Sequence, residues 1–180
     1  MYICFDTETT GLSAEKDEIL ELAITDENGN TLFHERFKPK RLTEWPEAQK
    51  VHGISPEDVK DCHIIDYYKR EIQDIFDKAT GYIGYNLSYD IGMLRGPMSD
   101  IYISDRKPVI DVMKKFAKIY GEKCYYGYKN KKLTVCAEYY GYQWTDKAHG
   151  ALADTLATLY CHKAILEQKS RQDIPEQLSM

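Results

Sequence analysis

The chain has 180 residues, of which 43% are hydrophobic and 29% are charged, and its formal net charge is −5. This length fits one domain with one hydrophobic core, and the composition is that of an ordinary globular protein. The sequence argues against a membrane-spanning protein, because no apolar stretch approaches the ~20 residues that cross a bilayer. We expect a cytoplasmic protein, since the apolar residues 1–5 are too few for a signal-peptide core.

The first half of the chain predicts strands before helices. Residues 2–8 read as a strand, and residues 18–26 and 31–37 read as a hairpin around Asn28-Gly29, a dipeptide typical of two-residue turns. A long connection at residues 38–65 contains short helical pieces, one of which begins with an N-cap at Ser55 followed by Pro56. A helix is predicted at about residues 66–79 from its apolar spacing.

The second half alternates short strands with helices. Apolar runs at residues 81–85 and 107–111 are each followed by a helix, the first from about residue 88 and the second ending at about 120. Two further helices are predicted at about residues 132–140 and 150–168. This order predicts an α/β domain at residues 1–168, built on a five-stranded mixed sheet of three antiparallel and then two parallel strands flanked by helices. A polar tail follows at residues 169–180.

Two carboxylates stand at the end of the first predicted strand. Asp6 and Glu8 share one face of that strand, about 6.6 Å apart at ~3.3 Å per residue. Partly buried carboxylates repel one another unless a cation lies between them, and oxygen ligands suit Mg²⁺ or Mn²⁺. Two solvent-facing acids at a fraying strand end are the alternative, and this short pattern alone favours that alternative.

Two more acids stand at helix starts. Asp90, in the stretch Asn86-Leu87-Ser88-Tyr89-Asp90, follows a short apolar strand, where helix capping by Asn or Ser is an equal alternative. Asp154 follows His149 by five residues, a rotation of about 140° on a helix, so the two side chains meet only if His149 lies on the incoming loop. A histidine beside a metal-bound carboxylate suits proton transfer. A cap-region histidine with an acid at a buried edge is the alternative.

In combination the three motifs resemble the DEDD exonuclease superfamily, in the branch that has a catalytic histidine. Asp6-Thr7-Glu8-Thr9-Thr10-Gly11-Leu12 is similar to the first motif, Asn86-x-x-Tyr89-Asp90 to the second, and His149-x₄-Asp154 to the third. The sister branch has tyrosine at the position of Gly150. The second motif departs from the family pattern, which has histidine at the position of Tyr85 and phenylalanine at that of Tyr89.

The resemblance implies a ribonuclease H-like fold and a 3′→5′ exonuclease that releases 5′-mononucleotides with two Mg²⁺ or Mn²⁺ ions. It implies metal ligands at four carboxylates (Asp6, Glu8, Asp90 and Asp154) and a general base at His149. It also implies that the terminal nucleotide is bound by residues of the motifs and of the segment from Pro46 to Ile54 (Thr9, Thr10, Gly11, Glu47, His52, Asn86 and Tyr89). The expected partner is a single-stranded 3′ end, with DNA favoured and RNA left open.

Residues 106–132 hold nine Lys or Arg against two acids, with five aromatic rings interleaved. Basic groups and stackable rings are what a single-strand path needs. A solvated helix face with core tyrosines is the alternative. Two rival functions also remain open: a proofreading subunit docked on a DNA polymerase, and a catalytically weak nucleic-acid-binding module of the same fold.

Overall fold

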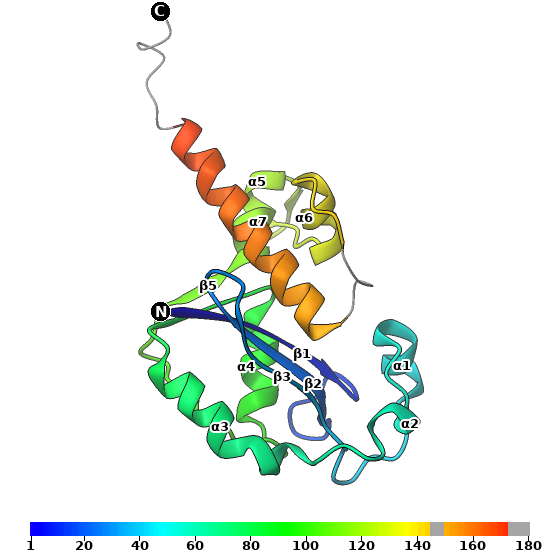
Figure 1. The fold of residues 1–180 in the computed structure, drawn as a ribbon. Helices are drawn as coiled ribbons and strands as arrows, with labels where there is room; N and C mark the ends of the chain where they lie inside the picture. Colours follow the sequence, from blue (N-terminus) through cyan, green and yellow to red (C-terminus); the bar gives the residue numbers. More distant parts are fainter. Residues whose placement is uncertain (145–149, 173–180) are drawn as a thin grey trace, which may run out of the picture.

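A five-stranded mixed sheet forms the centre of the computed structural model, which describes residues 1–144 and 150–172 (Figure 1). The sheet has the order β3-β2-β1-β4-β5. Its strands are β1 (Tyr2–Thr9), β2 (Ile19–Asp26), β3 (Thr31–Arg36), β4 (Gly81–Gly84) and β5 (Val109–Asp111). The first three strands pair antiparallel, whereas β1–β4 and β4–β5 pair parallel. The predicted fold class is therefore confirmed.

Helices cover both faces of the sheet (Figure 1). On one face α3 (Ile65–Lys78) and α4 (Leu87–Arg95) bury apolar side chains against β1. On the other face lie α5 (Val112–Tyr120), α6 (Leu133–Tyr139) and the long α7 (Ala151–Gln172). Each predicted helix is found within a few residues of its expected bounds.

The alternation of side chains along β1 decides which face each residue serves. Ile3 and Phe5 belong to the core under α3 and α4, whereas Cys4 belongs to the core under α5, α6 and α7. Because side chains alternate along a strand, Asp6 and Glu8 share the face of Cys4. The fold therefore directs both carboxylates toward α7.

Two short helices lie beside the carboxyl end of β1. They are α1 (Pro46–His52) and α2 (Pro56–Val59), which pack with Leu20 and Trp45 in a small separate core. The predicted cap at Ser55 is present, since its hydroxyl accepts from the N–H of Asp58 while the Asp58 carboxylate accepts from the N–H of Ser55. This capping box gives the connection a defined path past the end of the sheet.

The predicted bounds of the hairpin are confirmed, because β2 ends at Asp26 and β3 begins at Thr31, although the two-residue turn that Asn-Gly favours is not formed between them. Four residues separate Asp26 from Thr31, and the carboxylate of Asp26 accepts hydrogen bonds from the N–H groups of Asn28 and Asn30, at 2.8 and 2.9 Å. Gly29 has a φ of +95°, in the left-handed region that glycine enters without strain. The Asp26 carboxylate thus stabilises a four-residue turn in place of the two-residue turn that Asn-Gly favours.

A second sheet was not predicted. It consists of β6 (Lys123–Cys124) and β7 (Gly127–Tyr128), which pair antiparallel. Strands of two residues carry no readable alternation of apolar and polar side chains, so the sequence pattern had no means of indicating them.

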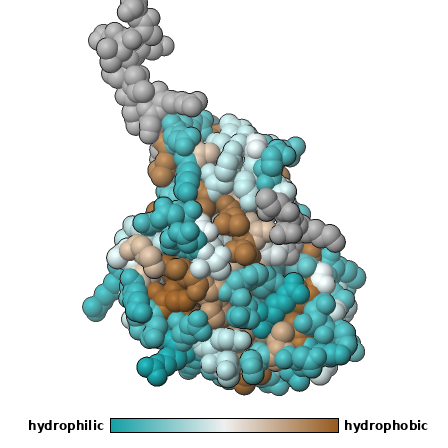
Figure 2. Space-filling model, in the orientation of Figure 1, coloured by the Kyte–Doolittle hydropathy of each residue, from teal (hydrophilic) through white to brown (hydrophobic). Residues whose placement is uncertain are grey.

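None of the helices in the described ranges is long and apolar enough to cross a bilayer. On the face drawn in Figure 2, most of the surface is hydrophilic and hydrophobic side chains gather in separate patches.

Candidate active site

Three carboxylates from distant parts of the chain meet at one point. Asp6 and Glu8 come from β1, and Asp154 comes from the first turn of α7. One oxygen of each of the three side chains lies within 4.8 Å of the others. His149, the predicted general base, lies outside the described residues.

The electrostatics of this cluster favour a bound cation. Burial, followed by the negative charges of Asp90, Asp154 and Glu8, raises the pKa of Asp6 well above its usual range. Burial together with Asp154 and Glu21 raises the pKa of Glu8 to about 8. Converging carboxylate oxygens that repel one another are the donor set that a hard divalent cation such as Mg²⁺ prefers. The residues present therefore fit a divalent metal.

Asp90 approaches the cluster from the opposite face of the sheet. It lies on α4, is 2% exposed, and accepts hydrogen bonds at one oxygen from both the N–H and the hydroxyl of Thr7, at 3.0 and 2.7 Å. Burial raises the pKa of Asp90 to about 7, against the lowering effect of the bonds from Thr7. Thr7 was not predicted as a site residue, although strand alternation placed it opposite Asp6 and Glu8. Its role depends on the position of α4, which sequence does not reveal.

Asn86 begins α4 without capping it. Its backbone is left-handed, with φ of 62°, and its side chain makes no cap hydrogen bond. Its backbone N–H donates to Asp111 at 3.2 Å. The capping alternative is therefore wrong for the Asn86 side chain, which lines a pocket instead.

A pocket of about 690 Å³ lies beside the carboxylates. Its lining includes Glu8 and all seven residues that the sequence predicted to bind the terminal nucleotide (Thr9, Thr10, Gly11, Glu47, His52, Asn86 and Tyr89). The roles of these residues remain predictions, but the structure places them around one space. Trp45 also lines the pocket and was missed; its indole N–H donates to the carbonyl of Ile54 at 2.7 Å.

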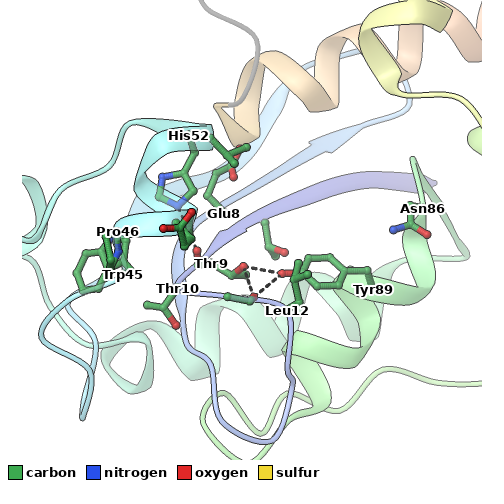
Figure 3. A pocket seen from close by; sticks show the side chains of 14 residues that line it. Glu8, Thr9, Thr10, Leu12, Trp45, Pro46, His52, Asn86 and Tyr89 are labelled. Carbon is green, nitrogen blue, oxygen red and sulfur yellow. Dashed lines mark hydrogen bonds between the residues drawn. The ribbon is translucent and has the colours of Figure 1, made fainter.

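The turn after β1 is held against α4 by the hydroxyl of Tyr89 (Figure 3). This hydroxyl donates to the carbonyl of Gly11 at 2.8 Å and lies 2.5 Å from the hydroxyl of Thr9. A Cβ at Gly11 would lie 2.6 Å from the carboxylate oxygens of Asp17, so a side chain there would displace the carboxylate that accepts from the N–H of Ser13. The hydroxyl of Tyr89 thus adds a fixed contact to the pocket wall.

His52 ties α1 to the same turn (Figure 3). Its Nδ1 accepts from the N–H of Ile54 at 3.0 Å, which leaves Nε2 to donate to the carbonyl of Thr9 at 3.1 Å. Glu47 lies nearer solvent, where its side chain is 85% exposed and pairs with Lys50. The pocket therefore has a rigid wall at Thr9 and an open rim at Glu47.

The strand order and the acidic cluster together define a ribonuclease H-like fold that carries a carboxylate site at the end of its central strand. A family model described as "Exonuclease" matches residues 3–161. The chain belongs to this exonuclease family, which confirms the resemblance that the three motifs indicated.

Several curated proteins are similar to the chain. The PolC-type DNA polymerase III of Bacillus subtilis is 27% identical over 96% of this chain, but the match spans only 12% of the polymerase. An uncharacterized exonuclease of Escherichia phage 186 is 32% identical, and the match covers 87% of this chain and 84% of the phage protein. The epsilon subunit of DNA polymerase III from Buchnera aphidicola is 28% identical over 88% of this chain and 72% of the subunit.

Solved structures share the fold. Exonuclease I superposes with a TM-score of 0.77 at 20% identity, covering 94% of this chain and 41% of exonuclease I. Exonuclease X in complex with 5′ overhanging duplex DNA superposes with a TM-score of 0.69 at 21% identity, covering 94% of this chain and 93% of exonuclease X. The chain thus spans less than half of exonuclease I and a small part of the PolC-type polymerases.

Proposed function

We propose that the chain is a metal-dependent 3′→5′ exonuclease that removes terminal nucleotides from single-stranded nucleic acid, with DNA as the favoured substrate. The observation that supports this most is the convergence of Asp6, Glu8 and Asp154 within 4.8 Å, beside a pocket of about 690 Å³. The membership of the chain in the exonuclease family also supports it.

The four acidic side chains have separate tasks in this proposal. Asp6, Glu8 and Asp154 hold two divalent cations, Mg²⁺ or Mn²⁺, and Asp90 contributes from α4 in the orientation that Thr7 imposes. When bound, such cations neutralise charge on the attacked phosphate and on the entering and leaving oxygens.

The remaining residues position the substrate and move protons. The terminal nucleotide occupies the pocket, where the backbone at residues 9–11, Glu47 and His52 contact its sugar and base, and Asn86 and Tyr89 complete the wall. His149 accepts a proton from the attacking water, a role proposed from the sequence alone. The water oxygen bonds to phosphorus as the bond from phosphorus to the 3′ oxygen of the penultimate nucleotide breaks. That oxygen takes up a proton and becomes the new 3′ hydroxyl, and a 5′-mononucleotide leaves.

The experiment that tests this proposal uses single-stranded DNA and RNA oligonucleotides labelled at the 5′ end, with Mg²⁺, Mn²⁺ or EDTA. We expect a ladder that shortens one nucleotide at a time, only with metal, and faster on DNA. Immediate release of a labelled mononucleotide would indicate the opposite direction, and internal fragments would indicate an endonuclease. A parallel preparation of Asp6→Ala controls for contaminating nucleases. Intact oligonucleotides with folded protein and metal would favour the nucleic-acid-binding module.

A second candidate is proofreading in association with a polymerase. The similarity to PolC-type polymerases and to an epsilon subunit of DNA polymerase III favours it. Co-elution of the chain with the replicative polymerase of the same organism in size-exclusion chromatography would support this candidate. Separate elution, with exonuclease activity in the free chain, would favour a stand-alone enzyme.

A further inference from the structure

The small hairpin of β6 and β7 projects two tyrosines from its tip. Cys124 pairs with Gly127, so Tyr125 and Tyr126 are the two residues of the turn. Gly127 has a φ of +128°, which lets the chain reverse at this point. The N–H of Lys129 donates to the carbonyl of Glu122 at 2.8 Å and closes the base of the hairpin.

The two rings at the tip are the most exposed of the five rings in residues 106–132. Tyr125 is 91% and Tyr126 is 93% exposed, and their rings meet edge to face at 4.7 Å. Phe116 is fully buried, and Tyr120 packs against it. The prediction that the rings of residues 106–132 line a single-strand path is therefore wrong for Phe116, which is a core residue. The most exposed rings of this segment are those of the hairpin. Exposed rings are available for stacking with other flat groups.

Positive charge surrounds these rings in a chain that is acidic overall. Residues 122–132 contain four lysines and one glutamate, a balance of +3, whereas the whole chain carries −5. Glu122 pairs with both Lys129 and Lys131, and the Nζ of Lys131 also lies 4.5 Å from the centre of the Tyr120 ring. Rings among lysines suit a ligand that has flat bases and phosphates.

The hairpin is anchored next to the active site. The hydroxyl of Tyr85 donates to the carbonyls of Lys131 and Lys132, at 2.8 and 3.2 Å. Tyr85 directly precedes Asn86, which lines the pocket for the terminal nucleotide. Four residues lie between Tyr126 and Lys131, so the tip can extend up to about 18 Å from this anchor over five Cα steps. At ~3.4 Å per nucleotide this distance corresponds to about five nucleotides of a stacked strand.

We propose that the β6–β7 hairpin binds the single-stranded region that leads to the 3′ end, with Tyr125 and Tyr126 stacking on unpaired bases and the lysines contacting phosphates. This inference rests on the proposed exonuclease function, because it takes the pocket as the position of the 3′ terminus. The hairpin determines how strongly the enzyme binds strands that are longer than a few nucleotides.

Binding without turnover gives the first test. The affinity for a single-stranded DNA of about 20 nucleotides is measured by fluorescence anisotropy in EDTA. The proteins compared are wild type, Tyr125→Ala, Tyr126→Ala, Tyr125→Phe and Tyr126→Phe. Each Ala variant should bind about five- to a hundredfold more weakly, the range of one lost base–ring stack, and the Phe variants should stay close to wild type. Tyr102→Ala removes a ring that is 68% exposed on the segment between α4 and β5, and it should bind like wild type. Equal affinities of the hairpin variants and Tyr102→Ala would overturn the proposal.

Kinetics on two substrate lengths give the second test. We expect the Ala variants to raise KM for the long strand much more than KM for a trinucleotide, whose length of about 10 Å is less than the full reach of the hairpin. An equal loss on both lengths would overturn the assignment to the upstream strand. An equal loss of affinity for blunt duplex DNA in the binding assay would overturn stacking on unpaired bases.

The two proposals fail in different ways. If the wild type shows metal-dependent turnover but the Tyr125 and Tyr126 variants bind as tightly as wild type, only the proposed role of the hairpin is contradicted. Tyrosine-dependent binding in EDTA by a protein that degrades nothing contradicts the exonuclease function and leaves a nucleic-acid-binding hairpin.

Discussion

Thr7 and Asp90 connect the two faces of the sheet, because the hydroxyl and the N–H of Thr7 both donate to Oδ1 of Asp90, at 2.7 and 3.0 Å. Strand β1, which presents Asp6 and Glu8 toward α7, thus also orients Asp90 on the opposite face of the sheet. We expect Thr7→Val to lower kcat about 10- to 100-fold and to raise the Mg²⁺ concentration needed for half activity, as for other residues that orient metal ligands. Thr7→Ser keeps the hydroxyl and should restore most of the activity. Equal activity of the Val and Ser variants would contradict this role.

Removal of a carboxylate from the cluster should abolish turnover. Asp6→Ala and Asp154→Ala each take away one of the three oxygens that lie within 4.8 Å, and with it a ligand of the proposed cations. The measurement is release of mononucleotides with Mg²⁺, accompanied by circular dichroism as a check of folding. Asp61→Ala, at an exposed acid, is the matched control and should retain activity. Near wild-type turnover of either cluster variant would refute the assignment of the site.

The metal-free protein should lose stability as the pH rises. The pKa of Glu8 is about 8 in the folded chain, above its ordinary value of 4.5, so the native state binds more protons than the unfolded state between these values. The free energy of unfolding should therefore decrease between about pH 5 and pH 8 in EDTA. Urea titrations at both pH values test this, and added Mg²⁺ should restore stability at the higher pH.

Glu8→Gln provides the control for this pH dependence. A neutral amide cannot titrate, so the variant should show a smaller decrease in stability over the same interval. A wild-type stability that increases with pH in EDTA would contradict the buried, mutually repelling cluster.

The hydroxyl of Tyr89 should affect substrate binding more than chemistry. Tyr89→Phe deletes the bonds to Gly11 and Thr9 and loosens the wall of the pocket. We expect a loss of about 0.5–1.5 kcal/mol in stability and a rise of up to about tenfold in KM for a trinucleotide, with a smaller change in kcat. Tyr160→Phe is the control, since it deletes a bond to the carbonyl of Tyr140 far along α7. If both variants changed KM equally, Tyr89 would have no particular role at the pocket.

The proposed general base can be tested in the same assay. His149→Ala should lower kcat by about 10²–10⁴, the usual contribution of a positioned base. The Mn²⁺ concentration for half activity should change little, because the variant retains all four carboxylates. Unchanged kcat would exclude His149 as the base, and a large shift in the metal requirement would make it a ligand instead.

Much of the fold could be predicted because its signals are local. The apolar spacing in residues 150–168 indicated α7, and the cap at Ser55 with Pro56 indicated α2. The hairpin of β6 and β7 was missed. Its strands have two residues each and are too short to show a period.

The sequence by itself determined that Asp6 and Glu8 share one face of β1, because alternation along a strand depends only on the parity of position. Only the tertiary structure decided that Asp154 meets them on that face, that Thr7 holds Asp90 on the other face, and that Trp45 lines the pocket. Local periodicity predicts the face on which a side chain lies, but it does not predict the distance between segments that are far apart in the chain. Those distances are set by how the helices pack on the two faces of the sheet.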